Sequence, residues 1–199
     1  MKHFASLTAI AFLSLAACSS GPEEPSATAS ASADVEDIAT EAPSADASEA
    51  APVAAPAAVL GLEGLGDLKI GKPVPKGSTW AERGAQTSDA CRTVSSPEYP
   101  GVYAIVEDGA VRRITLGQNS KVKLAEGIGV GATEKEVQGW FAGFRSEPHK
   151  YESAPAKYLT APNARPGESA LRFEIKSDGR VGLIHVGEMP VLAYVEGCA

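Results

Sequence analysis

Helical and alternating patterns of apolar residues are concentrated in the later part of this chain, and the clearest of them predicts a short helix. Thr133 and Glu136 have the Ser/Thr-x-x-Glu spacing of a capping box, in which each side chain accepts a hydrogen bond from a backbone amide at the start of a helix. Val137, Trp140 and Phe141 follow at i, i+3 and i+4, so we expect one apolar stripe that faces a core.

Two Asp-Gly pairs, at 108–109 and 178–179, separate runs of apolar and β-branched residues, and this pattern predicts two β-hairpins. The strand before the second turn alternates apolar with charged residues: Leu171, Arg172, Phe173, Glu174, Ile175 and Lys176. Such alternation is typical of an antiparallel strand with one buried and one solvated face. We therefore expect a sheet that leaves one face in water.

The domain divides into two halves of similar layout, 59–120 and 121–199, which both end in a D-G-x-V-x-x-I hairpin. Pro73 and Pro75 prevent a second capped helix in the first half, so the repetition would be degraded there. Further strands are expected at 147–151, 157–160 and 191–195. The predicted fold is α+β: an antiparallel sheet with one or two short helices packed on one face, arranged as a degenerate tandem repeat.

The first 17 residues carry one Lys and an apolar run that is too short to span a bilayer, and their last three residues form an L-A-A-C sequence with Cys18. They resemble a bacterial lipoprotein signal peptide (1–17). This resemblance implies that Cys18 is acylated, with palmitate among its lipids, and becomes the mature N-terminus. Ser19 stands where the resemblance places an Asp in proteins kept at the inner membrane, so we expect an outer-membrane lipoprotein on the periplasmic side.

The segment 18–58 is built from Ala, Ser, Pro, Thr and acidic residues, and after Cys18 it contains no aromatic or basic residue. Such a sequence buries too little apolar surface to offset the entropy of ordering, so we predict a disordered linker. Eight of the chain's 25 acidic residues lie in it, and one of the 18 basic residues lies in the signal, which leaves 17 of each from residue 59 onward. The single domain 59–199 is therefore neutral, and nucleic acid is an unsuitable partner for it.

Cys91 and Cys198 are the two cysteines of the domain, and an exported chain favours a disulfide between them. A loop of that length would stabilise the fold by up to about 4.7 kcal/mol in the chain-entropy model. A reactive thiol and a metal-binding pair are the alternatives, but no CxxC spacing supports either.

Four short motifs resemble an uncharacterised family of proteobacterial lipoproteins and secreted proteins: G-I-G-V-G-A-T-E-K-E-V at 127–137, P-H-K-Y at 148–151, D-G-R-V at 178–181 and Y-V-E-G-C at 194–198. The helix-opening motif alone is also similar to the repeats of β-lactamase-inhibitor proteins and of the small lipoprotein of the β-barrel assembly machinery. These resemblances imply a helix-then-sheet fold and bring no catalytic residue with them.

The sequence offers weak candidates for chemistry. His149 and His185 lack the spacing of a zinc motif, and no G-x-S-x-G elbow is present. The glycines at 127–131 lack the Lys-Ser/Thr of a phosphate loop, and the carboxylates Glu147 and Glu152 lack a supporting pattern. We therefore assign no catalytic residue, no metal and no cofactor.

Aromatic and basic residues near expected loops and strands are better candidates, because such residues are enriched at recognition surfaces. The candidate partner surface consists of Tyr151, Tyr158, Arg112, Arg113 and Lys157. We expect a non-enzymatic domain that binds an envelope protein or polymer, with membrane contact through the lipid on Cys18. The alternative is an inhibitor-like module of an envelope or secreted hydrolase, and a cell-wall-active enzyme is the third hypothesis.

Overall fold

The computed structural model describes residues 58–198, which belong to one compact unit. The predicted signal peptide, Cys18 and the linker up to residue 57 lie outside the described residues. Within the described range, no helix combines the length and apolar character needed to cross a bilayer.

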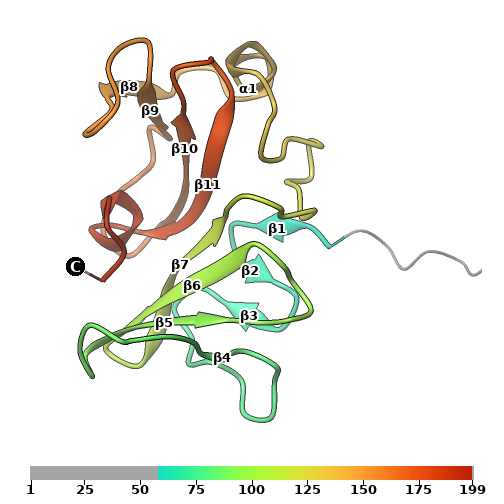
Figure 1. Ribbon diagram of the computed structural model, residues 1–199, viewed down its shortest axis with the longest axis vertical. Coiled ribbons are helices and arrows are strands. Elements are labelled where there is room, and N and C mark those ends of the chain that lie inside the picture. Colours follow the sequence, from blue (N-terminus) through green and yellow to red (C-terminus); the bar gives the residue numbers. More distant parts are fainter. Residues whose placement is uncertain (1–57, 199) are drawn as a thin grey trace, which may run out of the picture. The chain divides into compact units, whose positions relative to one another are not determined.

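An eight-stranded antiparallel sheet forms the main framework, in the strand order β4-β5-β6-β7-β11-β10-β9-β8. The first half of the domain supplies β4 (Ala81–Glu82), β5 (Cys91–Ser95), β6 (Val102–Glu107) and β7 (Ala110–Leu116). The second half supplies β8 (Arg145–Pro148), β9 (Lys157–Thr160), β10 (Ser169–Ile175) and β11 (Val181–Glu188). Figure 1 shows the first-half strands in the lower part of the view and the second-half strands in the upper part.

Both predicted hairpins are confirmed. Asp108 and Gly109 have φ angles of 52° and 76° and connect β6 to β7. Two consecutive positive φ angles are the requirement of the tight hairpin turn that Asp-Gly favours. The second turn contains Gly179 with φ 74° and connects β10 to β11.

The two halves meet where β7 pairs with β11. Gly187 of β11 lies opposite Arg113 of β7, and a Cβ atom at Gly187 would collide with the backbone of Arg112 and Arg113. The seam between the halves therefore depends on a glycine.

The capping box is confirmed at the start of α1 (Glu134–Trp140), where Thr133 and Glu136 accept from each other's backbone amides. Val137 is fully buried, and the ring of Phe141 lies 5.4 Å from that of Phe173 in β10. Trp140, however, is 64% exposed, so the expected three-residue stripe is wrong at this position. The rings of Phe141 and Phe144 already pack on Phe173, and the seven-residue helix leaves Trp140 outside this cluster.

The first half has no counterpart of α1 among its described residues, and the predicted repeat is not confirmed. Its apolar sheet face is covered instead by a small three-stranded sheet of β1 (Leu60–Gly61), β2 (Gly64–Leu65) and β3 (Leu68–Lys69). Leu60, Leu65 and Leu68 are all buried in the same core as the apolar residues of β7. Over residues 58–198 the fold is α+β, with one α-helix and two antiparallel sheets.

The expected last strand at 191–195 is also wrong. Residues 189–198, which we call the C-terminal segment, turn back after β11 and contain the 3₁₀ helix η1 (Val191–Ala193). The segment ends at Cys198, which forms a disulfide with Cys91 of β5 at a Cα separation of 5.6 Å. This pairing was predicted from the sequence.

Candidate binding site

A row of polar side chains crosses the middle of the large sheet. Tyr103 of β6 lies opposite Thr115 of β7, and Thr115 lies opposite His185 of β11. The row continues through Arg172 of β10 to Thr160 of β9. Because directly opposed residues project to the same side of a sheet, these five side chains share the face turned away from α1. We call it the polar face.

The centre of the row joins the two halves of the sheet. Thr115 Oγ1 lies 2.9 Å from His185 Nδ1, and both side chains are buried. Burial, assisted by the nearby guanidinium groups of Arg113 and Arg172, lowers the pKa of His185 well below its usual value. The imidazole is therefore uncharged at neutral pH.

Arg172 is buried rather than solvated, which corrects the prediction of a sheet face left in water. Its Nη1 donates to Glu147 Oε2 and to Thr160 Oγ1, both at 3.0 Å. Its guanidinium carbon also lies 4.2 Å from the ring centroid of Tyr158. An ion pair and a cation–π contact together compensate the buried charge.

His149 organises the loop that follows β8. Its Nδ1 accepts hydrogen bonds from the backbone amides of Tyr151, at 3.1 Å, and Glu152, at 2.9 Å, so the ring proton is on Nε2. Nε2 faces Glu174 Oε1 at 3.2 Å, and the ring stacks on Tyr158 at a centroid distance of 4.8 Å. His149 Nδ1 thus fixes the backbone of the loop, whereas Nε2 is buried beside the Glu174 carboxylate without forming a hydrogen bond to it.

Arg113 holds the C-terminal segment against the first half of the polar face. Its Nη1 donates to the carbonyl oxygens of Val191, at 3.2 Å, and of Tyr194. Val191 packs on Ile105 of β6, and the Arg113 side chain is only 1% exposed. Burial lowers the pKa of Arg113, but a guanidinium remains charged at neutral pH. At this position the C-terminal segment, and not solvent, covers the polar face.

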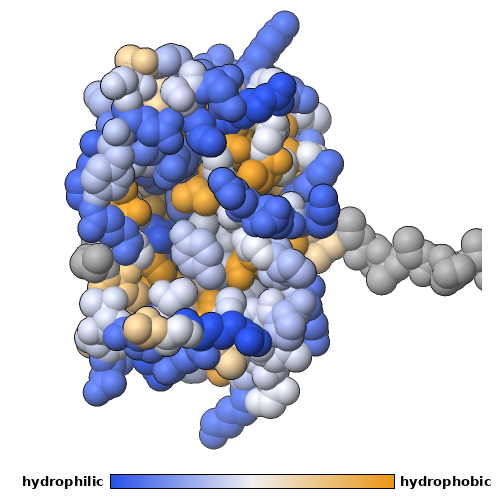
Figure 2. All heavy atoms as spheres, in the orientation of Figure 1, coloured by the Kyte–Doolittle hydropathy of each residue, from blue (hydrophilic) through white to orange (hydrophobic). Residues whose placement is uncertain are grey.

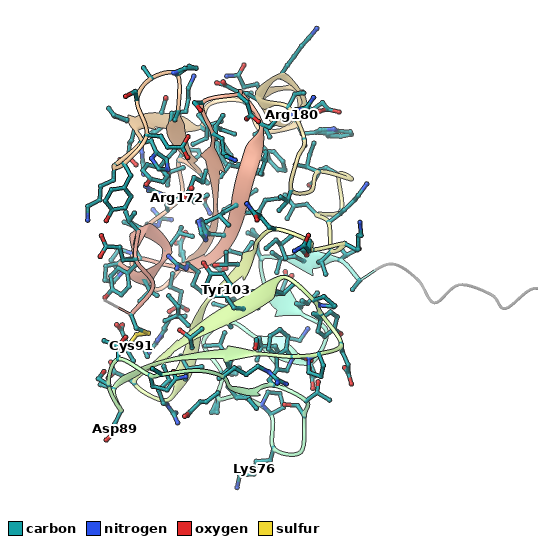
Figure 3. The ribbon with its side chains drawn as sticks, viewed as in Figure 1. Lys76, Asp89, Cys91, Tyr103, Arg172 and Arg180 are labelled. Atoms are coloured by element: carbon teal, nitrogen blue, oxygen red, sulfur yellow. A yellow bond between two sulfur atoms is a disulfide. The ribbon has the colours of Figure 1, made fainter. Side chains whose placement is uncertain are left out.

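Figure 3 labels Tyr103 and Arg172, which come from opposite halves of the sheet, and shows the disulfide beside Cys91 at the edge of the first half. In the same orientation, Figure 2 shows hydrophilic residues around the outline of the molecule and apolar residues gathered near the middle, where the two halves of the sheet meet. We call the loop between β8 and β9, which carries the exposed Tyr151, the rim of the polar face.

The five residues of the candidate partner surface do not form one exposed surface. Tyr151 is 60% exposed on the loop after β8, whereas Tyr158 is 4% exposed beneath His149 and Arg113 is buried under the C-terminal segment. Only Tyr151 of these three is accessible to a partner.

The other two candidates are held in ion pairs. Arg112 Nη1 lies 2.8 Å from Glu188 Oε2, and Lys157 Nζ lies 3.0 Å from Glu134 Oε1 of α1. Lys157 therefore belongs to the helix side of the sheet, away from Tyr151.

Reasoning from the sequence missed Tyr103, Thr115, Arg172 and His185 as parts of one site. Neighbouring residues of the row are up to 70 positions apart in the sequence, from Thr115 to His185, and the register that aligns them depends on the pairing of β7 with β11. No local pattern carries that information.

Within residues 58–198, no three His, Cys, Asp or Glu side chains come together as a metal site would require. Comparison of the chain with protein-family models, curated proteins and solved structures finds no match. The contacts of the polar face and its rim are therefore the basis for a functional proposal.

Proposed function

We propose that this protein is a bacterial envelope lipoprotein, anchored at the outer membrane through an acylated Cys18, whose domain binds another envelope protein or polymer without catalysing a reaction. The partner contacts the rim of the polar face at Tyr151. The Cys91–Cys198 disulfide supports an extracytoplasmic location, because disulfides persist in oxidising compartments.

The observation that carries the binding proposal is an exposed aromatic ring on a fixed loop. The backbone of Tyr151 is tied to His149 Nδ1, and the ammonium of Lys150 lies 5.2 Å from the centroid of the Tyr151 ring. Lys150 Nζ also pairs with Glu196 of the C-terminal segment at 3.2 Å. An aromatic side chain that is already ordered loses little entropy on binding, and such residues are typical anchors of interfaces.

The state of the two histidines favours binding over acid–base chemistry. His149 uses Nδ1 to accept from two backbone amides and keeps Nε2 buried beside Glu174, and His185 is buried against Thr115 with a pKa that burial lowers. A general base must reach the proton of a substrate within hydrogen-bond distance. Neither imidazole is free to do so in this arrangement.

Metabolic labelling tests the anchor. Cells that express the full chain with labelled palmitate should yield a labelled protein in the outer-membrane fraction, and Cys18→Ser should yield an unlabelled protein that leaves this fraction. An unlabelled wild-type protein, or one found in the cytosol, would disprove the anchor.

Site-specific photo-crosslinking tests the binding surface. A photoreactive phenylalanine at position 151 should form an adduct with a defined envelope protein or with cell-wall polymer. The same group at Lys135 serves as the control, because Lys135 is also exposed and belongs to α1 on the other face of the sheet. Equal adducts at both positions, or none at position 151, would contradict the proposal. Tyr151→Ala should then reduce recovery of the same partner by about tenfold if Tyr151 is an interface anchor.

A further inference from the structure

A second candidate site lies on the opposite side of the sheet from the polar face. A cavity of about 240 Å³ opens between β1, the turn at 124–126, the end of α1 and the inner face of β10 and β11. Its sheet wall includes Leu171 and Val186, which alternate along their strands with Arg172 and His185 of the polar face. The two sites therefore have no lining residue in common.

The walls of this cavity are almost entirely apolar. Phe141 and Phe144 lie 5.5 Å apart, and both rings pack on Phe173, at 5.4 and 5.9 Å. Leu60 and Leu124 contribute further to the lining. An apolar cavity of about 150 Å³ already holds benzene, so the larger space here accommodates a longer hydrocarbon group.

Few polar groups line the cavity, and the Arg145 guanidinium donates to the carbonyl oxygen of the lining residue Pro162 at 3.5 Å. Glu126 is the one ionisable residue in the described lining, and Asn163 supplies an amide. A carboxylate beside a low-dielectric cavity disfavours an anionic ligand. The chemistry fits an uncharged or zwitterionic headgroup attached to an apolar chain.

Three exposed apolar residues belong to the cavity lining or lie close to it in the sequence. Leu62 lines the opening and is 45% exposed, and Val59, at 49%, precedes it on the same stretch of chain. Trp140, the neighbour of the lining residue Phe141, is also exposed. Tryptophan and aliphatic residues around an opening are suited to the boundary between water and lipid, where Trp is enriched.

We propose that this cavity binds one hydrocarbon chain of an uncharged or zwitterionic membrane lipid, with Leu62, Val59 and Trp140 at the membrane surface. The position of Cys18 is consistent with this, because only 39 residues separate it from Ala58, the residue at which the described chain begins beside the cavity wall. Thirty-nine residues reach at most roughly 130 Å, so an acylated Cys18, on which this step rests, would keep the domain within that distance of the membrane.

The test uses the full chain with Cys18→Ser, so that no acyl group of its own competes. The probe is N-phenyl-1-naphthylamine, an uncharged fluorophore that brightens in apolar sites. It should bind saturably, and dodecyl lysophosphatidylcholine below its micelle concentration should displace it. Dodecanoate should be the weaker competitor, by about tenfold, because of its charge. Failure of the probe to saturate, or of the lysolipid to displace it, would overturn the proposal.

Two matched alanine substitutions locate the site. Ala125 is exposed and lines the opening, whereas Ala85 is exposed on a loop away from the cavity. Ala125→Trp should weaken lysolipid binding by at least about tenfold, and Ala85→Trp should change it by less than about twofold. Equal affinities of the two variants would place binding elsewhere. Thermal unfolding checks that both variants are folded, and Leu62→Gln, expected to weaken binding by about threefold, replaces Ala125→Trp if that variant is not.

A substitution of Glu126 tests the preference of the cavity for a zwitterionic over an anionic lipid. Glu126→Gln should tighten dodecanoate binding by about threefold or more and leave lysolipid binding within about twofold. If the variant keeps the same preference for the zwitterionic lipid, Glu126 does not determine the charge preference of the cavity. Because Tyr151 and the polar face are untouched by all these variants, the outcome is independent of the crosslinking experiment proposed for that face.

Discussion

The hydroxyl of Thr115 lies 2.9 Å from Nδ1 of His185, and this contact joins the last strand of the first half of the sheet to the last strand of the second. Both groups are buried. Since the imidazole is paired as a neutral group, a proton can be added only at a cost in folding free energy.

This burial predicts a pH dependence of stability. Burial lowers the pKa of His185 well below its usual value, so below about pH 6.5 the unfolded chain binds a proton that the folded protein does not. The neutral His185 makes its full contribution to stability above about pH 6.5. Below that pH the free energy of unfolding falls by up to about 1.4 kcal/mol per pH unit. Urea unfolding of wild type and His185→Gln from pH 8 to pH 5 measures the difference.

The His185→Gln variant isolates this effect, because all other titrating groups are common to both proteins. We expect it to lose about 1 to 2 kcal/mol at pH 8 through weaker pairing with Thr115. Its slope between pH 6.5 and pH 5 should be shallower than that of wild type by up to one proton. Parallel slopes would show that His185 is protonated in the folded state.

Gly187 allows a direct test of the seam between the halves. Gly187→Ala places a Cβ against the backbone of Arg112 and Arg113, and backbone cannot move aside as a side chain can. We expect a loss of about 3 kcal/mol, at the upper end of the cost of overpacking. Gly139→Ala in α1 is the control: nothing lies within 4 Å of its added Cβ, so the helix should gain about 0.5 to 1 kcal/mol. Thermal unfolding measures both, and a neutral Gly187→Ala would contradict the close approach.

Features specified by a few neighbouring residues were predictable from the sequence. The capping box of Thr133 and Glu136 needs only four consecutive positions, and the Asp108-Gly109 turn needs two positive φ angles that these residues adopt readily. Both occur where the pattern placed them. The disulfide was predictable for a different reason, since the domain has a single pair of cysteines.

Features specified by contacts between distant residues were not predictable. Residues 191–195 have the composition of a strand, but residues 191–193 form a 3₁₀ helix. Arg113 holds this segment in place by donating to the carbonyl oxygens of Val191 and Tyr194. Arg172 has the spacing of a solvated residue, but Glu147 and the Tyr158 ring compensate its charge in a buried position. Each partner lies far away in sequence, so no periodicity reveals it.

The same reasoning applies to the candidate surface. An exposed Tyr151 and a buried Tyr158 look alike in sequence, because each belongs to one of the two predicted strands at 147–151 and 157–160. They differ because His149 turns inward, stacks on Tyr158 and holds the loop so that Tyr151 points to solvent. The His149 imidazole thus covers Tyr158 and leaves Tyr151 exposed.

The guanidinium of Arg113 is expected to contribute strongly to stability. Arg113→Ala removes two charge-assisted hydrogen bonds, to the carbonyl oxygens of Val191 and Tyr194, and hydrogen bonds to charged groups contribute about 1.5 to 3 kcal/mol each. The Val191 oxygen keeps the backbone amide of Tyr194 as a donor, whereas the Tyr194 oxygen loses its donor. We expect a total loss of about 3 kcal/mol or more in urea unfolding. Arg112→Ala is the matched control on the same strand, because its pair with Glu188 is partly solvated and should contribute less than about 1 kcal/mol. Equal losses would argue against a special role for Arg113.

The disulfide and Arg113 hold the same segment but should act on different states of the chain. The Cys91–Cys198 bond spans 107 positions, and in the chain-entropy model it stabilises by up to about 4.7 kcal/mol through the unfolded state. Replacing both cysteines by Ser should therefore lower global stability by about 3 to 5 kcal/mol while Arg113 keeps the C-terminal segment in place. Arg113→Ala instead removes contacts in the folded state. Native-state hydrogen exchange separates the two: the amides of Ala193 and Tyr194 should lose protection selectively in Arg113→Ala, and only together with the rest of the domain in the double Ser variant. Selective loss in the double Ser variant would show that the disulfide, and not Arg113, fastens the segment.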